Sequence, residues 1–520
     1  MIPSVMNGNL GEAEQFIMRE LGDNDDLSAR HFRIFGQYEA VMFHFANMNQ
    51  KELLHDDILK ALMVIPAHLS DRDISIDRLQ QVILQDALTY SDCKLEGDLS
   101  KLIGGLLRGD TIIFVNGLSQ AFIVGTRHID KRAVDQPATE QVIRGPREGF
   151  IEQLGTNVAL IRYRLQTKSL HVHSMEIGER THSKVAICFI DDIADPALVK
   201  EVKKRLSNIR IDAVLDSGYL EQFIEDNNLS PFPQVQYTER PDKVVANLLE
   251  GRVALLVDGS PLALLVPTVF NQFYQTVEDY TERFLLMSAI RLARMIALVF
   301  SLIFPSLYVA IISYNPELIP TEFAVAVAGG RAGVPFPALI EVLIIEVSME
   351  VLREATIRLP QQVGGALSIV GVLVIGQAAV SAGFASPITV VVIALTTIGS
   401  FATPAYNAAL ALRLLRFPLI FMAGIFGLYG IMVGLILIVN HLLSLRSFGV
   451  PYLSPLVPGD ISGMKDLIFR APLWSMKKRP SFLRPTDPTR LDPKTVEQLK
   501  QPSNNVLGPE SQSNGKEPVS

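Results

Sequence analysis

The sequence FLLMSAIRLARMIALVFSLIFPSLYVAIIS, at residues 284–313, decides the fold of this chain. Its only charged residues are Arg291 and Arg294, which lie about one helical turn apart near its start. At about 1.5 Å per residue, a helix of this length is long enough to cross about 30 Å of hydrocarbon. The stretch therefore predicts a membrane-spanning helix.

The apolar composition extends well beyond this stretch. Between Tyr280 and Gly459 the sequence has no Lys, Asp, Cys or Trp, whereas Lys and Asp are scattered freely before and after. Over all 520 residues, hydrophobic residues make up 48%, too many for an average soluble enzyme, and charged residues make up 19%, too many for a pure transporter. We therefore predict a soluble N-terminal half followed by a polytopic helical membrane bundle.

Four more segments are candidate crossings, and they leave the side of the C-terminal tail open. They are residues 363–382, 388–412 and 418–443, together with the shorter acidic stretch 336–352, which is either a charged pore or interface helix or a re-entrant segment. If all five segments cross, the arginines that flank them lie on the cytosolic side, as the positive-inside rule requires, but the tail lies outside. The tail itself is rich in Lys and Arg, so the positive-inside rule would place the tail in the cytosol. Five crossings place it on the opposite side, and the two predictions conflict. The last segment carries four glycines predicted to form one helix contact face, namely Gly424, Gly427, Gly430 and Gly434.

The predicted fold class is α+β joined to a membrane α-helical domain, with the N-terminal half in the cytosol. Residues 1–149 form a first α/β subdomain with strands at 38–45 and 111–115, the second closing a hairpin with 121–124. Residues 150–280 form a second subdomain with a βαβ pattern, in which Asp195-Pro196 opens a helix between strands at 184–190 and 209–215. The remaining divisions are a membrane domain at 281–445, a membrane-proximal segment at 446–480 and a disordered tail at 481–520.

The most informative stretch is PFPALIEVLIIEVSMEVLREATIRLP, at residues 335–360. Glu346, Glu350 and Glu354 recur every four residues and so form a stripe along one face of the predicted helix. Carboxylates at membrane depth are costly and normally face a partner or water. Two interpretations stay open: a cation-attracting ring shared by several copies, or a Glu–Arg network within one chain. The next apolar segment adds two polar groups. The candidate pore or gating residues are Glu341, Glu346, Glu350, Arg353, Glu354, Arg358, Gln377 and Ser381.

The sequence offers no clear catalytic, cofactor or metal site. No nucleophile elbow, Walker loop, HExxH or paired-Cys motif occurs, so neither enzymatic activity nor a cofactor is predicted. His171 and His173 could share one face of a strand, but no acidic residue is placed convincingly beside them, so with His182 we interpret them as exposed strand residues. Cys93 and Cys188 are interpreted as buried thiols in a reducing compartment. The net charge of −7 argues against a nucleic-acid partner, and no signal peptide is visible.

A set of short motifs runs in order along residues 30–480. The motifs are Arg144-Gly-Pro-Arg-Glu-Gly-Phe150, Ser230-Pro-Phe-Pro233, Thr238-Glu-Arg-Pro241, Val257-Asp-Gly-Ser-Pro261, Gly333-Val-Pro-Phe-Pro337, Leu352-Arg-Glu-Ala355, Leu359-Pro360, Ser368-Ile-Val-Gly371, Ile375-Gly-Gln-Ala-Ala379 and Arg446-Ser-Phe-Gly-Val-Pro-Tyr452. Together they resemble the A subunits of the GerA-type spore germination receptors.

The resemblance implies a function in spore germination at the spore inner membrane. It implies two partners, a transporter-like B subunit that senses the nutrient and a C subunit that is a lipoprotein. It also implies that the A subunit forms a homo-oligomer in the lipid membrane and conducts monovalent cations when the nutrient binds. The alternatives are a non-conducting scaffold subunit and the paralogous stage V sporulation AF proteins, which have the same architecture. A secondary transporter ranks last because no internal repeat is visible.

Overall fold

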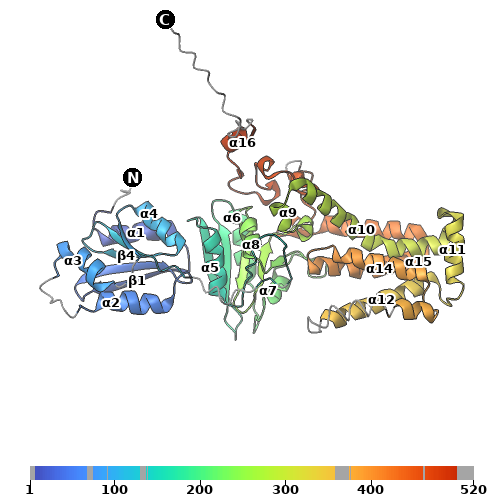
Figure 1. Cartoon of the computed structure of the whole chain (residues 1–520), viewed down its shortest axis with the longest axis horizontal. Coiled ribbons are helices and arrows are strands. Elements are labelled where there is room, and N and C mark those ends of the chain that lie inside the picture. The colour runs from blue at the N-terminus through green and yellow to red at the C-terminus, as the bar shows by residue number, and fades with distance from the viewer. Residues whose placement is uncertain are drawn as a thin grey trace, which may run out of the picture.

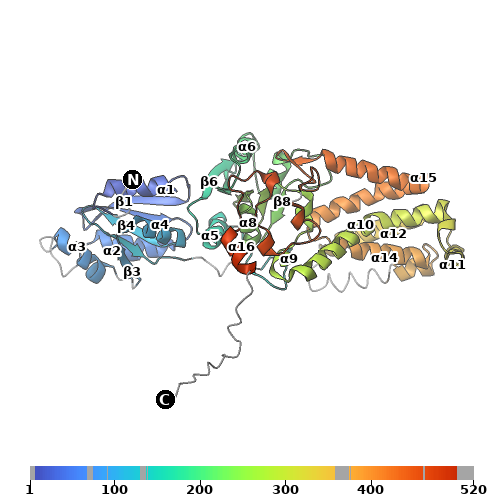
Figure 2. The same ribbon diagram turned by 90° about the horizontal axis from the view of Figure 1, so that it is seen from above.

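The computed structural model describes residues 6–66, 74–88, 90, 92–128, 136, 137, 139–357, 374, 376–460 and 463–500. The molecule is elongated, with two soluble subdomains followed by a helical half (Figure 1). A second view shows the same order along the long axis (Figure 2). In both views the last described helix, α16, lies beside the second subdomain and not beyond the helical half.

The first subdomain is a five-stranded antiparallel sheet in the order β1-β2-β4-β5-β3. Alternate residues of β2 point to opposite faces, so Met42 packs in the core under α2 and α3, whereas Phe43 packs under α1 and α4. The predicted hairpin is confirmed, since β4 pairs with β5. The elements are α1 Leu10–Leu21, β1 Leu27–Ile34, β2 Tyr38–Phe45, η1 Leu53–Leu59, α2 Lys60–Met63, α3 Ile76–Val82, η2 Ile83–Ala87, β3 Cys93–Glu96, α4 Leu99–Arg108, β4 Thr111–Val115 and β5 Ala121–Val124.

The second subdomain repeats this plan with the strand order β6-β7-β9-β10-β8. One face of its sheet packs against α6 and α7, and the other against α5 and α8. The predicted helix start at Asp195 is confirmed, because its carboxylate accepts the Ala197 N–H and Pro196 occupies the first turn. The elements are α5 Leu154–Arg164, β6 Leu170–Ile177, β7 Ser183–Ile190, α6 Pro196–Ser207, α7 Ser217–Ile224, β8 Gln236–Thr238, α8 Pro241–Leu248, β9 Val253–Val257, β10 Ala263–Val266, η4 Phe270–Tyr274 and α9 Glu278–Thr281.

The predicted βαβ pattern in the second subdomain is wrong. Every pair of neighbouring strands in this sheet is antiparallel, and residues 209–215 form a loop. Ile209 and Val214 are buried in the core, which explains the apolar pattern. The carbonyl of Ile211 accepts a hydrogen bond from the Glu179 N–H in the β6–β7 turn, so the backbone is satisfied without a strand partner.

Among the described residues of the helical half, two helices are long and apolar enough to cross a membrane, α10 and α15. The predicted span at 388–412 is wrong at its end, because α14 stops at Phe401 and a new helix begins at Tyr406, after Thr403-Pro404. Of the predicted span at 363–382, the structure describes residues 374 and 376–382, of which 374 and 376–381 are helical. The elements are α10 Phe284–Tyr314, η5 Pro316–Leu318, α11 Thr321–Arg331, α12 Ala338–Ile357, α14 Pro387–Phe401 and α15 Tyr406–Ser444.

Helix α15 is folded back on itself at Gly427. This glycine has φ 61° and ψ −141°, a combination essentially restricted to glycine. Leu419 from before the turn lies against Gly434 from after it, although a straight helix would hold these residues far apart. The predicted contact face of four glycines on one helix is therefore wrong. Gly427 makes the turn, and Gly434 allows the two legs of the hairpin to pack closely.

The hairpin returns the chain to the soluble half. At the start of the α15 hairpin, the Ala405 N–H donates to the carbonyl of Phe273. After the end of the hairpin, the Tyr452 N–H donates to the carbonyl of Leu445. Tyr452 also anchors the returning chain, because its hydroxyl donates to the carbonyl of Pro233 at 2.6 Å. At the far end, the Tyr314 hydroxyl from α10 donates to the carbonyls of residues 424 and 425 next to the turn.

The C-terminal segment packs along the second subdomain. The backbone N–H of Thr486 donates to the carbonyl of Ile193, and Arg479 Nε donates to the carbonyl of Leu249. The prediction of disorder from residue 481 is therefore wrong for residues 481–500. The elements of this segment are β11 Arg446–Ser447, β12 Val450–Pro451, η6 Gly463–Asp466, η7 Leu473–Ser475, η8 Ser481–Leu483 and α16 Pro493–Lys500.

Candidate functional site

The acidic helix α12 packs among the other helices, and the exposure of its glutamates increases along the helix from Glu341 to Glu354. It begins after Pro337, whose carbonyl accepts the Glu341 N–H. The Glu341 side chain is fully buried, and it accepts a hydrogen bond from the Ser386 N–H at 2.5 Å. Its other oxygen lies 3.2 Å from Arg331 Nε, at the end of α11. Glu341 thus joins three segments at the end of the helical half that is distant from the soluble subdomains.

About one and a half turns along α12, Glu346 forms a deeply enclosed ion pair with α15. Arg416 Nη1 from α15 donates to both of its carboxylate oxygens, at 3.0 and 2.9 Å. The two side chains are only 4% and 3% exposed. A pair so far from water contributes little net stability, but removal of one partner leaves an uncompensated charge. The pair therefore fixes how α12 sits against the first leg of α15.

Glu350 lies where the acidic stripe reaches the surface. Its side chain is 33% exposed, forms an ion pair with Arg353 and lies 3.4 Å from Arg413 Nε. These three residues line an open cavity of about 500 Å³ together with the exposed Glu354. Acidic and basic groups thus meet in a space large enough for hydrated ions. The cavity also contacts Tyr406 at the start of α15.

The structure brings Glu350, Arg353 and Glu354 together around one cavity, whereas Glu341 and Glu346 lie in separate buried ion pairs. Gln377 and Ser381 lie on the helical segment 376–381 with exposed side chains. Arg358 lies outside the described residues. The sequence analysis did not identify Arg331, Arg413 and Arg416 as the partners of the carboxylates. The only signal for the latter two was their place before the last apolar segment, which the positive-inside rule already explained.

A second charged network joins the first long helix to both soluble parts of the chain. Arg291 in α10 lies 3.1 Å from Asp279 of the second subdomain and 2.8 Å from Asp466 of the C-terminal segment. The Tyr280 hydroxyl donates to Asp466 at 2.5 Å. Burial raises the pKa of Asp466, and Arg291 opposes this shift. These contacts tie α10 to both the second subdomain and the C-terminal segment.

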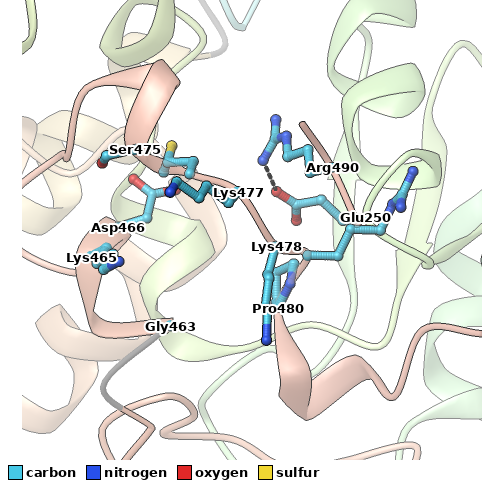
Figure 3. Close-up of a pocket in the computed structure, with 11 residues that line it drawn as sticks. Glu250, Gly463, Lys465, Asp466, Ser475, Lys477, Lys478, Pro480 and Arg490 are labelled. Atoms are coloured by element: carbon cyan, nitrogen blue, oxygen red, sulfur yellow. Dashed lines mark ion pairs between the residues drawn. The ribbon is translucent and has the colours of Figure 1, made fainter. Parts of the chain in front are cut away.

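A basic pocket of about 250 Å³ opens beside this junction. Lys465, Lys477 and Lys478 line it, and Figure 3 shows their side chains around the same space as Glu250. The dashed line in Figure 3 marks the ion pair between Glu250 and Arg490, at 3.6 Å. The pocket is formed largely by the C-terminal segment where it crosses the second subdomain.

Comparison with known protein families gives one match that spans nearly the whole chain. The family described as "Bacillus/Clostridium GerA spore germination protein" matches residues 15–482. This chain belongs to the GerA family. The resemblance found in the motifs is thereby confirmed. The match covers both soluble subdomains, the helical half and most of the C-terminal segment.

Individual relatives of this GerA-family chain agree with that assignment. Spore germination protein KA of Bacillus subtilis (strain 168) is 41% identical over 94% of this chain and 89% of its own length. The uncharacterized membrane protein YfkQ of the same organism is 44% identical over 88% of this chain and 87% of its own length. The crystal structure of the N-terminal domain of the A subunit of the Bacillus megaterium spore germinant receptor GerK3 is 33% identical, covering 52% of this chain and 99% of that domain, with a TM-score of 0.41.

Proposed function

We propose that this GerA-family chain is the A subunit of a nutrient-gated germinant receptor, and that several copies form a channel for monovalent cations in the spore inner membrane. In this proposal a transporter-like B subunit senses the nutrient and a lipoprotein C subunit completes the complex. The observation that carries it is the gradient along α12, from the fully buried Glu341 through the 33% exposed Glu350 to the exposed Glu354. Carboxylates that approach the surface of a membrane bundle attract cations where water reaches them.

The distribution of basic residues supports a multi-pass arrangement with both the soluble half and the C-terminal segment in the cytosol. In this proposal the helical half makes six passes, with the two legs of α15 counted separately: α10, α12, a pass that includes the described helical residues 376–381, α14 and the two legs. The connections at the far end, residues 315–337, 382–386 and 424–430, contain one basic residue, Arg331. The near ends carry Arg283, Arg353 and Arg446. An even number of passes removes the contradiction that five crossings created for the tail.

Ion flux tests the proposal. We expect the complete receptor, reconstituted in potassium-loaded vesicles, to release potassium when nutrient is added. Glu350→Gln should reduce this flux severalfold, because the carboxylate at the cavity is neutralised while Arg353 and Arg413 remain. Ser348→Ala, at a half-buried neighbour on α12 whose hydroxyl donates to the Ile344 carbonyl within the helix, is the matched control. Absence of nutrient-dependent flux of potassium or sodium would refute conduction.

A second candidate function, a non-conducting scaffold, is favoured by the ion pairs themselves. Glu341 and Glu346 are buried and paired with arginines of the same chain, as expected for residues that hold helices in place. A scaffold predicts that Glu350→Gln leaves nutrient-triggered ion release unchanged. It also predicts that disruption of the junction around Arg291 abolishes assembly of the complex. The flux and assembly measurements together distinguish the two functions.

A further inference from the structure

Two histidines and an aspartate from different subdomains converge at the joint of the soluble half. His171 and His173 lie on the same face of β6, two residues apart. Asp23 lies in the loop between α1 and β1 of the first subdomain. Its Oδ2 atom is 3.2 Å from His171 Nδ1 and 3.4 Å from His173 Nε2. The same Nδ1 donates to the Asp23 carbonyl at 2.9 Å, a hydrogen bond that a metal ion would replace. One ligand atom from each of the three residues lies within 4.8 Å of the others.

The loop that carries Asp23 is pinned against β6 by its neighbours. The Asp25 N–H donates to the carbonyl of Val172 at 3.0 Å, and the Val172 N–H donates to Asn24 Oδ1 at 3.0 Å. Next to them, Arg162 of α5 forms a buried ion pair with Asp26, at 2.5 Å. These contacts hold the loop as an additional edge on the second sheet, so the position of Asp23 is fixed by both subdomains.

The two imidazole rings are also held in place. Both stack on the ring of Phe189 in the adjacent strand β7, with centroid distances of 5.6 and 5.3 Å. The Nε2 atom of His173 is buried and makes no hydrogen bond within the described part of the chain.

We propose that Asp23, His171 and His173 bind a first-row divalent metal ion, with Zn²⁺ as the best match, and that the ion fastens the two soluble subdomains together. Zinc binds imidazole nitrogen at about 2.0–2.1 Å in a tetrahedron, which places neighbouring ligand atoms about 3.3 Å apart. The distances from Asp23 to the two histidines agree with that spacing. Imidazole and carboxylate donors suit Zn²⁺, and three protein ligands leave a fourth position for water. Asp23 and the histidines come from different subdomains, so the ion opposes their separation.

Metal titration of the purified full chain in detergent, without an affinity tag, tests this site. We expect about one Zn²⁺ per chain, measured by competition with a chromophoric chelator, and a higher midpoint temperature of unfolding with added Zn²⁺. Asp23→Asn and His173→Gln should each weaken the affinity by about tenfold or more, which is about 1.4 kcal/mol. His31→Gln, an exposed histidine on β1 that lies beside Glu14, is the matched control and should bind as the unsubstituted chain does.

Three results would overturn the proposal. The first is the absence of stoichiometric Zn²⁺ binding by the folded chain. The second is binding that both Asp23→Asn and His173→Gln leave unchanged, which would place the metal elsewhere. The third is loss of binding with His173→Gln but not with Asp23→Asn, since a site on one subdomain cannot fasten two. Circular dichroism of each variant verifies that the chain remains folded.

Discussion

The soluble and helical halves place their charged and apolar residues in opposite ways. In the soluble subdomains, large apolar side chains such as Phe122 are fully buried, and pairs such as Lys168–Glu20 lie at the surface. In the helical half, Leu285 is 71% exposed, whereas Glu346 and Arg416 are almost completely enclosed. Water favours the first arrangement and lipid the second. The comparison teaches that the few charges inside the helical half are placed there for a structural or functional reason.

Removal of an enclosed arginine is expected to have the largest effect. Arg416→Ala leaves Glu346 buried without a cation and should destabilise the chain by about 3–5 kcal/mol. Arg413→Ala is the matched control on the same helix. Its partner Glu350 is 33% exposed and keeps Arg353, so the loss should be clearly smaller. The midpoint of thermal unfolding in detergent compares the two variants. Equal effects would mean that the Glu346–Arg416 pair is not enclosed as described.

A substitution at the hairpin turn is expected to have the next largest effect. Gly427→Ala forces a side chain into a conformation essentially restricted to glycine and against the Tyr314 ring, at a cost of about 1–3 kcal/mol. Gly329→Ala in α11 is the control, since an added methyl group there meets no described atom within 4 Å. The same unfolding measurement applies. A neutral Gly427→Ala variant would argue that α15 is a continuous rod.

Within the soluble half, a pH-dependent contribution is expected from Glu221 in α7. Burial, with Glu225 and Asp216 nearby, raises the pKa of Glu221 to about 7. The folded state then binds the proton more tightly than the unfolded chain, so this stability is present at low pH and is lost as the pH rises through about 7. Between about pH 5 and pH 8, the free energy of unfolding should fall by about 1–2 kcal/mol more in the unsubstituted chain than in the Glu221→Gln variant.

The control for Glu221→Gln is Glu176→Gln, whose side chain on β6 is 57% exposed. This variant should follow the pH profile of the unsubstituted chain. A Glu221→Gln profile that is also parallel to the unsubstituted chain would show that the Glu221 carboxyl titrates equally in the folded and unfolded states. Unfolding followed by intrinsic fluorescence or circular dichroism across the pH range provides the measurement.

The smallest effect is expected from an exposed ion pair between the two soluble subdomains. Lys168 Nζ lies 2.7 Å from Glu20, but its side chain is 59% exposed. Lys168→Ala should therefore cost less than about 1 kcal/mol. Comparison with Arg416→Ala measures how strongly the surroundings change the consequence of removing a cation. A large loss from Lys168→Ala would contradict the contrast between the two halves.

Local patterns predicted much of the soluble half, because its strands and turns are encoded by neighbouring residues. The hairpin of β4 and β5 and the start of α6 at Asp195 follow from turn and capping chemistry. Residues 209–215 were misinterpreted because a buried loop that packs Ile209 and Val214 has the same apolar pattern as a strand. Periodicity does not reveal whether the backbone hydrogen bonds go to a neighbouring strand or to a turn.

The long-range features could not be predicted from the sequence. Gly427 lies in an apolar run where a glycine is equally compatible with close helix packing, so the turn in α15 was missed. The partner of Glu346 is Arg416, on a different helix far along the sequence. In the same way, Asp23 is distant in sequence from the histidines that it approaches. Sequence spacing identified groups that need partners, but only the fold identifies the partners.

The most direct test of cation conduction is chemical modification of Glu354→Cys during potassium flux. This exposed position lines the cavity beside Glu350, and Cys93 and Cys188 can first be replaced by Ala to remove the native thiols. A water-soluble, positively charged thiol reagent should then reduce nutrient-triggered potassium flux, whereas Val299→Cys, an exposed position on the apolar surface of α10, should be insensitive. Unchanged flux after complete modification at position 354 would contradict the proposal that cations pass beside the acidic helix.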